Sequence, residues 1–412
     1  MKNKRTPDIR FLEFTKIWDE RKLKDVANFI RGSFPQPYTN PDWYDAENGR
    51  PFVQVADIGF DLKLNKDTKL HISKVAEPKS RFVEAGKVVV ALQGSIEKSI
   101  GRVAITQYDA FFDRTILIFE SYKTEIDNHY FAQVIQKLFQ REKEKAWGAT
   151  ISTITKEALS DFVIGVPNIE EQTKIGNFLK QLDDTIALHQ QELTTLKQAK
   201  QGFLQKMFPK EGEFVPEIRF PGFTGDWKQC KLNEVAEIIG GGTPKTDVQE
   251  YWDGDIDWYS PMEIGNEIYA FGSQRKITAL GLKKSSAKIL PANKTILFTS
   301  RAGIGDMAIL KNDGATNQGF QSLVVNNNYD IYFVYSIGYK IKEFALKHAA
   351  GSTFLEISGK GLGEMNLFVP SLEEQTKIGN FFKQLDDMIA LHQRELDAFN
   401  ETKKAFLQKM FA

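Results

Sequence analysis

Four glycine-containing segments combine small residues with aromatic and basic side chains, a mixture suited to contacting an extended anionic ligand. Two lie at residues 32–44 and 91–102, and two lie at 240–261 and 298–308. Glycine lets a backbone approach a phosphate closely, and basic or amide side chains can hydrogen-bond base edges. In and beside these segments, the candidate DNA contacts are Arg31, Lys98, Arg102, Thr243, Lys245, Tyr251, Trp252 and Arg301. Ordinary surface loops are the alternative interpretation, and for Trp252 a place in a core is favoured.

The same regions lack the residue patterns of catalytic sites. IIGGGTPKT at 238–246 is glycine-rich but lacks the Gly-Lys-Ser/Thr ending of a phosphate loop. NPDWY at 40–44 is similar to the N-P-P-Y motif of amino-methyltransferases, but Asp42 replaces the second proline. Glu401 and Lys403 have the spacing of a nuclease-like Glu-x-Lys, without an aspartate in a suitable context. We therefore expect no catalytic residue, no metal site and no cofactor bound by this chain.

Length and composition limit the class of protein. A chain of 412 residues with 42% hydrophobic residues can bury sizeable cores in two to four domains. The lone Cys230 excludes an intramolecular disulfide and a multi-cysteine zinc site, which fits the reducing cytoplasm. No apolar run approaches the ~18 residues of a membrane span, and no apolar segment follows the charged start. The net charge of zero argues mildly against nucleic-acid binding, although a neutral total can hide a basic face.

One long helix-forming segment occurs twice in the chain. Residues 170–208 and 373–411 are identical at 28 of 39 positions. PDIRF at 7–11 also recurs as PEIRF at 216–220, and the stretch 150–167 recurs more loosely at 353–370. Between these repeated segments the two halves diverge. This pattern of two similar long helices and two divergent intervening segments indicates a protein that holds two different domains at a fixed separation.

The apolar residues of both repeated segments recur at alternating steps of three and four, which is the seam pattern of a coiled coil. At 1.5 Å per residue each helix would be about 55–60 Å long, and its most available partner is the other copy. We expect the two helices to pair antiparallel about a pseudo-two-fold axis. The expected seam and interface residues are Ile175, Phe178, Leu182, Ile186, Leu193, Ile378, Phe381, Leu385, Ile389 and Leu396.

Two further pairs of residues occupy special places in the repeat. Gly176 and Gly379 fall in the first turns of the helices, where either a close backbone approach or a frayed turn explains them. His189 and His392 fall on the seam. We expect them to be packed and hydrogen-bonded there, because neither has a second ligand at metal-site spacing on its own helix face.

The predicted fold class is α+β, with two mixed α/β domains of divergent sequence joined by the two long helices. Strands are predicted at 88–92, 114–119, 295–299 and 320–325, and helices at 130–145 and 329–348. The expected boundaries are an N-terminal domain (1–166), a first spacer helix (167–208), a linker (209–226), a C-terminal domain (227–369) and a second spacer helix (370–412).

The whole chain resembles the specificity subunits of type I restriction-modification systems. The EEQTKI opening of each repeated helix is typical of that family. GGTPKT…EYWDGDIDWYSP at 241–261, SRAGIGDMAIL at 300–310 and ATNQGFQSL at 315–323 are similar to its recognition domains. The first domain matches more loosely, because GSFPQP replaces GGTPKT and DAFFDRTILIF lacks the Asn317-Gln318 pair.

The resemblance implies a non-catalytic subunit that binds double-stranded DNA. Each recognition domain would read one half of a bipartite, asymmetric site, while the helices fix the spacing and dock two methyltransferase subunits. Restriction-translocase subunits would join for cleavage, and S-adenosylmethionine, ATP and Mg²⁺ would be bound by the partner subunits.

Two other functions stay open at this stage. One is a coiled-coil scaffold that does not bind nucleic acid, which the zero net charge favours. The other is a stand-alone DNA adenine methyltransferase built on NPDWY. The outer apolar positions of the helices, Leu179 and Phe382 among them, exceed what one mutual seam can bury, so we expect the isolated chain to be poorly soluble.

Overall fold

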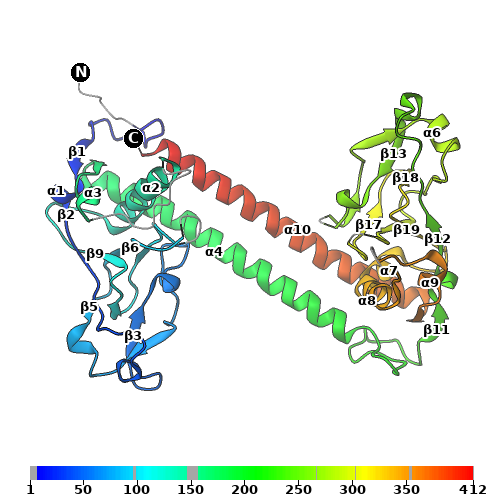
Figure 1. Cartoon of the computed structure of the whole chain (residues 1–412), viewed down its shortest axis with the longest axis horizontal. Helices are drawn as coiled ribbons and strands as arrows, with labels where there is room; N and C mark the ends of the chain where they lie inside the picture. Colours follow the sequence, from blue (N-terminus) through cyan, green and yellow to red (C-terminus); the bar gives the residue numbers. More distant parts are fainter. Residues whose placement is uncertain are drawn as a thin grey trace. The chain divides into compact units, whose positions relative to one another are not determined.

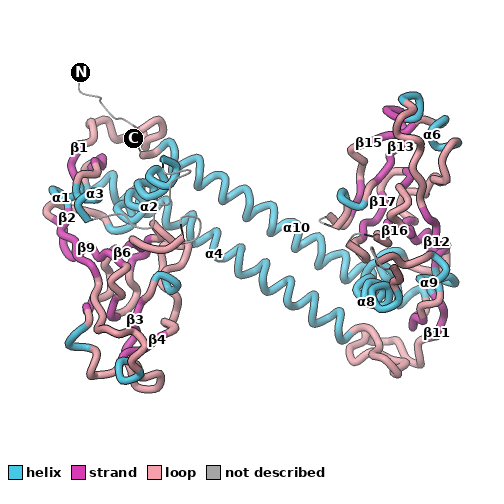
Figure 2. Tube along the Cα trace, in the orientation of Figure 1, coloured by secondary structure: helices cyan, strands magenta, loops and turns pink. Residues whose placement is uncertain are grey.

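The computed structural model describes residues 7–95, 99–145, 156–265, 267–301, 303–351 and 355–411. The chain forms two compact units (Figure 1). Unit 1 contains residues 1–192 and 392–412, and unit 2 contains residues 193–391. Each unit combines strands, short helices and loops with part of both long helices, as Figure 2 shows. The predicted α+β class is confirmed.

The described residues of unit 1 form ten strands in small sheets. The strands are β1 (Asp19–Lys22), β2 (Ala27–Arg31), β3 (Arg50–Val53), β4 (Leu70–Ile72), β5 (Arg81–Val83), β6 (Val88–Ala91), β7 (Val103–Ile105), β8 (Ala110–Phe112), β9 (Ile116–Tyr122) and β10 (Val163–Val166). The helices are α1 (Leu23–Val26), η1 (Pro41–Trp43), η2 (Val55–Asp57), η3 (Glu77–Lys79), α2 (Asn128–Lys145), α3 (Lys156–Ser160) and the first part of α4 (Ile169–Lys206).

The core of unit 1 lies on both faces of the sheet β2-β9-β6-β7. Side chains alternate along strand β6: Val88 and Val90 pack with helix α2, whereas Val89 and Ala91 pack with the sheet β4-β3-β8-β5. This alternation follows from the two-residue period of a strand whose two faces are both buried. The sheet is therefore held between a helix and a second sheet, and the loops at its ends stay at the surface.

Unit 2 is built from the corresponding elements. The strands are β11 (Lys228–Lys231), β12 (Ala236–Gly240), β13 (Trp252–Tyr259), β14 (Tyr269–Ala270), β15 (Arg275–Ile277), β16 (Thr295–Phe298), β17 (Met307–Leu310), β18 (Gly314–Thr316), β19 (Gln321–Val325) and β20 (Asn366–Val369). The helices are α5 (Leu232–Val235), η4 (Gln249–Tyr251), η5 (Pro261–Glu263), α6 (Ala279–Lys283), α7 (Ile331–Ser336), α8 (Gly338–His348), α9 (Gly359–Gly363) and α10 (Leu372–Lys409).

Both units share one strand topology in spite of their divergent sequences. The order β12-β19-β16-β17 in unit 2 corresponds to β2-β9-β6-β7 in unit 1, and β15-β13-β18 corresponds to β4-β3-β8. The predicted strands are confirmed as β6, β9, β16 and β19, and the helix predicted at 130–145 is α2. The helix predicted at 329–348 is instead two helices, α7 and α8, which meet at Ile337.

A glutamate of the repeated EEQ sequence joins the start of each long helix to the unit in which that helix begins. Glu171, 1% exposed, accepts two hydrogen bonds from Arg10 at 2.6 and 2.7 Å. Glu374, also 1% exposed, accepts two from Arg219 at 2.7 and 2.8 Å. These bidentate, charge-assisted pairs join the repeated segments PDIRF and PEIRF to the helix starts. The recurring acidic residues are therefore structural, which the sequence pattern alone did not reveal.

Gly176 and Gly379 mark close approaches between backbones and not frayed turns. A Cβ on Gly176 would overlap Asp127 Oδ1 and lie 2.9 Å from Tyr130 N. A Cβ on Gly379 would overlap Asp330 Oδ1 and lie 3.0 Å from the N of Phe333. Each long helix thus crosses the N-terminus of a shorter helix at a point where only glycine fits.

The two long helices run antiparallel inside each unit. In unit 1 the rings of Phe178 and Phe406 are 4.9 Å apart, and the ammonium group of Lys403 pairs with the buried carboxylate of Asp183 at 2.5 Å. In unit 2 the corresponding Lys200 pairs with the buried Asp386. Each unit therefore contains one copy of the same apolar and ionic contacts between α4 and α10.

The expected excess of apolar helix surface has a different explanation. Leu179 and Phe382 are both 0% exposed, because they pack into the cores of units 1 and 2 respectively. The premise behind the expected poor solubility is therefore wrong for these positions. In the described part of the chain no helix has the length and apolar character needed to cross a membrane.

Candidate nucleic-acid interface

In unit 2, the two loops predicted to contact DNA lie together with a further loop, 316–319, at the ends of β12, β16 and β18. A Cβ on Gly241 would overlap the carbonyl oxygens of Thr316 and Asn317, so the glycine is required for close packing. Gly242 N donates to Thr316 O at 2.8 Å, and the hydroxyl of Thr243 hydrogen-bonds the side-chain oxygen of Gln318. We call residues 240–246, 300–301 and 316–319 the loop cluster of unit 2.

The loop at residues 300–301 is held by its own contacts. Ser300 N donates to Gly319 O at 2.7 Å, which joins the loop to the Asn317-Gln318 segment. The guanidinium of Arg301 pairs with Glu356 at 2.9 Å and is partly exposed. Backbone hydrogen bonds therefore fix the loops, and the exposed side chain of Gln318 and the partly exposed guanidinium of Arg301 remain available for an external ligand.

Unit 1 builds the corresponding cluster with different side chains. A Cβ on Gly32 would overlap the carbonyls of Phe112 and Asp113, as expected for the position equivalent to Gly241. Tyr38 donates to Asp113 Oδ2 at 2.5 Å, and Arg114 lies over the Tyr38 ring at 5.5 Å. Burial, with the hydrogen bond to Asp113, raises the pKa of Tyr38, so its hydroxyl stays a donor. We call residues 32–38, 54–57, 92–95, 99–102 and 113–115 the loop cluster of unit 1.

A hollow of about 460 Å³ opens in this cluster. Its walls include the amide of Gln93, the hydroxyls of Ser99 and Thr115, and Arg102. These groups donate and accept hydrogen bonds at the edge of the sheet, where a base or a phosphate can be contacted. The hollow therefore combines apolar walls such as Val55 and Ala56 with one cation, Arg102, and a few hydrogen-bonding groups.

A second hollow of unit 1, about 630 Å³, lies between α2 and the C-terminal part of α10, and we call it the basic groove. Six cationic side chains and no acidic one are among the described residues that line it: Arg102, Lys137, Arg141, Lys143, Lys403 and Lys404. Burial and, as the smaller cause, the neighbouring Arg102 lower the pKa of Lys143. Such a surface attracts an anionic backbone.

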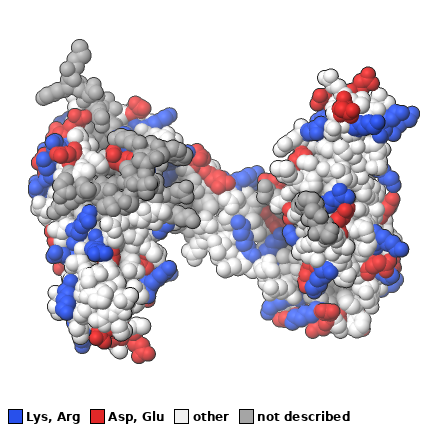
Figure 3. Space-filling model, viewed as in Figure 1, with Lys and Arg blue, Asp and Glu red and all other residues white. Residues whose placement is uncertain are grey.

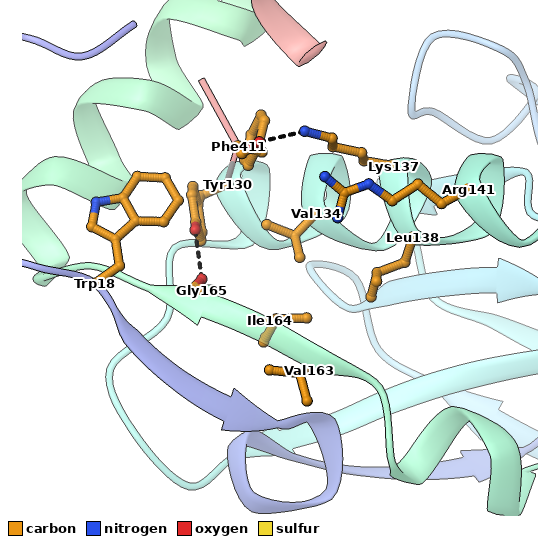
Figure 4. A pocket seen from close by; sticks show the side chains of 10 residues that line it. All are labelled: Trp18, Tyr130, Val134, Lys137, Leu138, Arg141, Val163, Ile164, Gly165 and Phe411. Atoms are coloured by element: carbon orange, nitrogen blue, oxygen red, sulfur yellow. Dashed lines mark hydrogen bonds between the residues drawn. The ribbon is translucent and has the colours of Figure 1, made fainter. Parts of the chain in front are cut away.

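Two lysines of the groove have structural partners. Lys403 pairs with Asp183, and Lys137 donates to the backbone carbonyls of Gln408 and Phe411. Figure 4 shows Lys137 reaching Phe411, whose ring lies 5.5 Å from that of Tyr130. Lys137 therefore seats the end of α10 against unit 1. Arg141 and the exposed Lys404 are better placed for a ligand.

The structure places the predicted contacts in several environments. Arg31 is partly buried at the end of β2, and Arg102 donates to Ile58 O at 3.1 Å while covering the Phe60 ring at 4.0 Å. Lys98 lies outside the described residues. Sequence reasoning missed Arg141 and Lys404. The four-residue spacing of Lys137 and Arg141 on one helix could have indicated the former.

In unit 2 the predicted contacts also separate into two groups. Thr243 and Arg301 lie in the loop cluster, and Lys245 is exposed. Trp252 is only 7% exposed, and its Nε1 donates to Lys245 O at 3.1 Å. It packs in a core with Tyr251 and is therefore a poor base contact, as its core interpretation suggested.

The expected seam residues differ in burial. Ile175, Leu193, Ile378 and Leu396 are at most 5% exposed. The others are partly buried: Phe178, Leu182, Ile186, Phe381, Leu385 and Ile389. Ile175 and Ile378, near the helix starts, pack into the cores of units 1 and 2, whereas Leu193 and Leu396 lie in the middle of the helices.

Charge is distributed over both units in a mixed pattern. On the face seen in Figure 3, cationic and anionic side chains are interspersed on each unit. The zero net charge of the whole chain therefore does not conflict with a local basic groove. Charge is concentrated by placement and not by composition.

A family model, described as the type I restriction modification DNA specificity domain, matches residues 15–198 and again residues 224–401. The chain is 40% identical over 169 residues to the type I restriction enzyme MjaIX specificity subunit of Methanocaldococcus jannaschii, covering 40% of this chain and 39% of that protein. A putative MjaX specificity subunit of the same organism is 24% identical and covers 96% of this chain and 93% of its own.

A solved structure has the same fold. The crystal structure of the S subunit of a type I restriction-modification system from M. genitalium matches with a TM-score of 0.66 and 17% identity, covering 99% of both chains. The two matches of the family model together span most of the sequence, one in each half. The chain therefore belongs to the type I restriction modification DNA specificity family, whose domain it carries twice.

Proposed function

We propose that this chain is the DNA-reading subunit of a type I restriction-modification complex and recognises a bipartite, asymmetric site. The N-terminal recognition domain (1–166) reads one half-site and the C-terminal domain (227–369) reads the other. One observation carries the proposal: the same loop cluster is built twice on one topology but with different side chains. Equivalent scaffolds with unlike contact residues read unlike sequences.

The repeated helices suit the connecting role. The spacer segments 167–208 and 370–412 set the separation of the half-sites, and residues 209–226 link the halves. Each helix has an exposed leucine at the equivalent position, Leu188 at 54% and Leu391 at 47%. A single exposed leucine on a helix is common in soluble proteins, so the proposal of two methyltransferase subunits as partners rests on the family to which the chain belongs.

The chemistry belongs to the partner subunits. No residue constellation in the loop clusters matches a nucleophile with a base, so we assign binding and not catalysis to this chain. S-adenosylmethionine, ATP and Mg²⁺ are bound by methyltransferase and restriction-translocase subunits. The complex works in the cytoplasm, where the DNA is.

Co-expression with the methyltransferase subunit, followed by long-read mapping of methyladenine in the host DNA, tests the proposal. We expect one split, asymmetric methylated motif, with one half contributed by each recognition domain. A stable complex that methylates no new motif, and shows no salt-sensitive DNA binding, would favour the scaffold alternative. Methyl transfer by the purified chain alone would instead support the stand-alone methyltransferase.

The spacing role has a separate test. Inserting one heptad into both long helices preserves the seam, because the apolar pattern repeats every seven residues. We expect the gap between the half-sites to change while both half-sites stay the same. A methylated motif with an unchanged gap would contradict the idea that the helices set the spacing.

A further inference from the structure

Unit 1 contains a cluster of two histidines and two glutamates between the long helices, which neither the DNA loops nor the helix starts use. His189 and Glu192 lie on α4, and His392 and Glu395 lie on α10. The Nδ1 atoms of the two histidines are 3.3 Å apart. Each glutamate approaches the histidine of the other helix at 3.4 Å, from Glu395 to His189 and from Glu192 to His392. We call these four residues the histidine cluster.

The distances in the histidine cluster match the edges of a tetrahedral metal site. Zinc binds imidazole nitrogen and carboxylate oxygen at about 2.0–2.2 Å, so two ligand atoms of one tetrahedral ion are separated by roughly 3.3–3.6 Å. The ligand atoms of His189, Glu192 and His392 all lie within 4.8 Å of one another. The Oε2 atom of Glu395 is 3.4 Å from His189 Nδ1 and 3.9 Å from His392 Nδ1.

The surroundings hold the imidazoles but leave the carboxylates adjustable. The side chains of His189 and His392 are 18% and 21% exposed, and the Phe399 ring lies 5.1 Å from that of His189. The side chains of the glutamates are more exposed, 44% for Glu192 and 41% for Glu395. Preplaced nitrogen ligands with mobile oxygen ligands allow an ion to enter from solvent and then complete its coordination.

Without an ion, the four side chains of the cluster contact one another through the two Nδ1 atoms and the two carboxylates. Two neutral imidazoles that face each other through Nδ1 can form a single N–H···N bond. Two half-exposed glutamates beside the same atoms add negative charge, which attracts a cation. The cluster therefore has the donor set of a zinc-class site, with neutral nitrogen and anionic oxygen ligands.

We propose that His189, Glu192 and His392 bind one divalent cation of the zinc class, with Glu395 or water as the fourth ligand. The ion connects α4 to α10 inside unit 1 and fixes the register of the two helices at that level. Two of its ligands, His189 and Glu192, stand three residues apart on α4, and the third, His392, comes from a segment about two hundred residues later in the sequence. The proposal does not depend on the DNA target.

The test uses the purified full-length chain, freed of metal by a chelator and titrated with Zn²⁺ or with Co²⁺ as a spectroscopic probe. We expect one equivalent of either ion to bind, with the visible absorption of tetrahedral Co²⁺. Zn²⁺ should raise the melting temperature of the protein. Even changes outside the ligand shell reduce metal affinity about 10–100-fold. Replacing a ligand in His189→Asn or His392→Asn should therefore reduce the affinity at least about 100-fold.

A matched control and a milder variant keep the test decisive. His348→Asn removes an exposed histidine that stacks on Phe344 at 4.0 Å, and should leave the stoichiometry and the spectrum unchanged. Glu192→Gln changes a half-exposed side chain that the fold does not need, and should weaken binding while the helical circular dichroism is kept. No tetrahedral Co²⁺ spectrum with the unmodified chain, or Zn²⁺ affinity that all the ligand variants retain, would overturn the proposal.

Discussion

Two equivalent turns, one in each unit, carry opposite charges on the same backbone. Gly101 in unit 1 and Gly305 in unit 2 both have positive φ, at 73° and 91°. Gly101 lies against Phe139 of α2, and Gly305 lies against Lys342 of α8. The next residue is Arg102 in unit 1 and Asp306 in unit 2. Arg102 lines the basic groove, whereas Asp306 accepts an ion pair from Lys342 at 3.0 Å. The backbone was kept and the surface charge was inverted.

The helices behind these turns differ in the same way. Arg141 and Lys143 of α2 correspond, 203 positions later, to Phe344 and Leu346 of α8. The lysine that seats a chain end is retained, because Lys340 donates to Pro209 O at 2.6 Å as Lys137 donates to Phe411 O. Contacts that hold the fold are thus duplicated, and residues that face outward have diverged.

The largest expected effect comes from breaking the duplicated ion pairs. Arg219→Ala leaves the buried carboxylate of Glu374 without its partner, which costs about 3–5 kcal/mol of unfolding free energy in unit 2. Arg10→Ala should cost less in unit 1, because Trp18 Nε1 still donates to Glu171 at 3.2 Å. Hydrogen exchange on the peptides of each unit separates the two effects.

Lys231→Ala provides the control for these variants. It removes an ion pair between Lys231 and Glu364, whose side chains are 47% and 52% exposed respectively. Little change in the unfolding free energy is therefore expected. Equal losses for Arg10→Ala and Arg219→Ala would contradict the role assigned to Trp18.

The glycine crossings give the next largest effect. Gly176→Ala and Gly379→Ala each force a methyl group against a helix N-terminus, and such overpacking costs about 1–3 kcal/mol of unfolding free energy. Gly202→Ala in the same helix α4 meets nothing within 4 Å and should stabilise by about 0.5–1 kcal/mol. Urea denaturation of the three variants measures both signs. Stabilisation by all three would mean that the crossings are looser than the structure indicates.

The repeat made much of this fold predictable from sequence. Identity at 28 of 39 positions identified the long helices, and short, largely apolar runs between turn residues gave strands such as β6 and β16. The break at Ile337 was missed, because the apolar pattern continues across α7 and α8 and only the backbone interrupts it. Local periodicity reports which face is buried and not where a helix turns.

Contacts between distant segments could not be predicted in this way. The histidines were expected to be packed, hydrogen-bonded seam residues, and they hydrogen-bond each other at 3.3 Å, but the approach of each to the glutamate of the other helix was not predicted. The role of Glu171 was likewise hidden, because its partner Arg10 stands 161 residues earlier. Spacing along the chain identifies ligands only when one element supplies them all.

A smaller effect, confined to one half-site, should follow from changes in the loop clusters. Gln318→Ala removes an exposed amide from unit 2, and a lost base contact is worth about 1–3 kcal/mol of discrimination. We expect relaxed sequence preference in one half of the methylated motif and none in the other. Arg114→Ala in unit 1 should relax the opposite half, and methylation mapping of both variants provides the comparison. Relaxation of the same half by both would contradict separate reading.

The smallest expected effect tests the basic groove, where the two units differ most in charge. Arg141→Ala removes a cation that we expect to contact a DNA phosphate, so affinity should fall to a similar degree for all sequences. The slope of log K against log salt should decrease by about 1, because one fewer counterion is released. Lys347→Ala on α8, paired with Glu343 at 2.8 Å, is the matched control and should leave the slope unchanged. Equal slopes for the two variants would mean that the basic groove does not contact the DNA. A change in sequence preference with Arg141→Ala would instead mean that Arg141 contacts a base. Either result would show that the charge inversion between Arg102 and Asp306 serves something other than holding the DNA backbone on one side of the site.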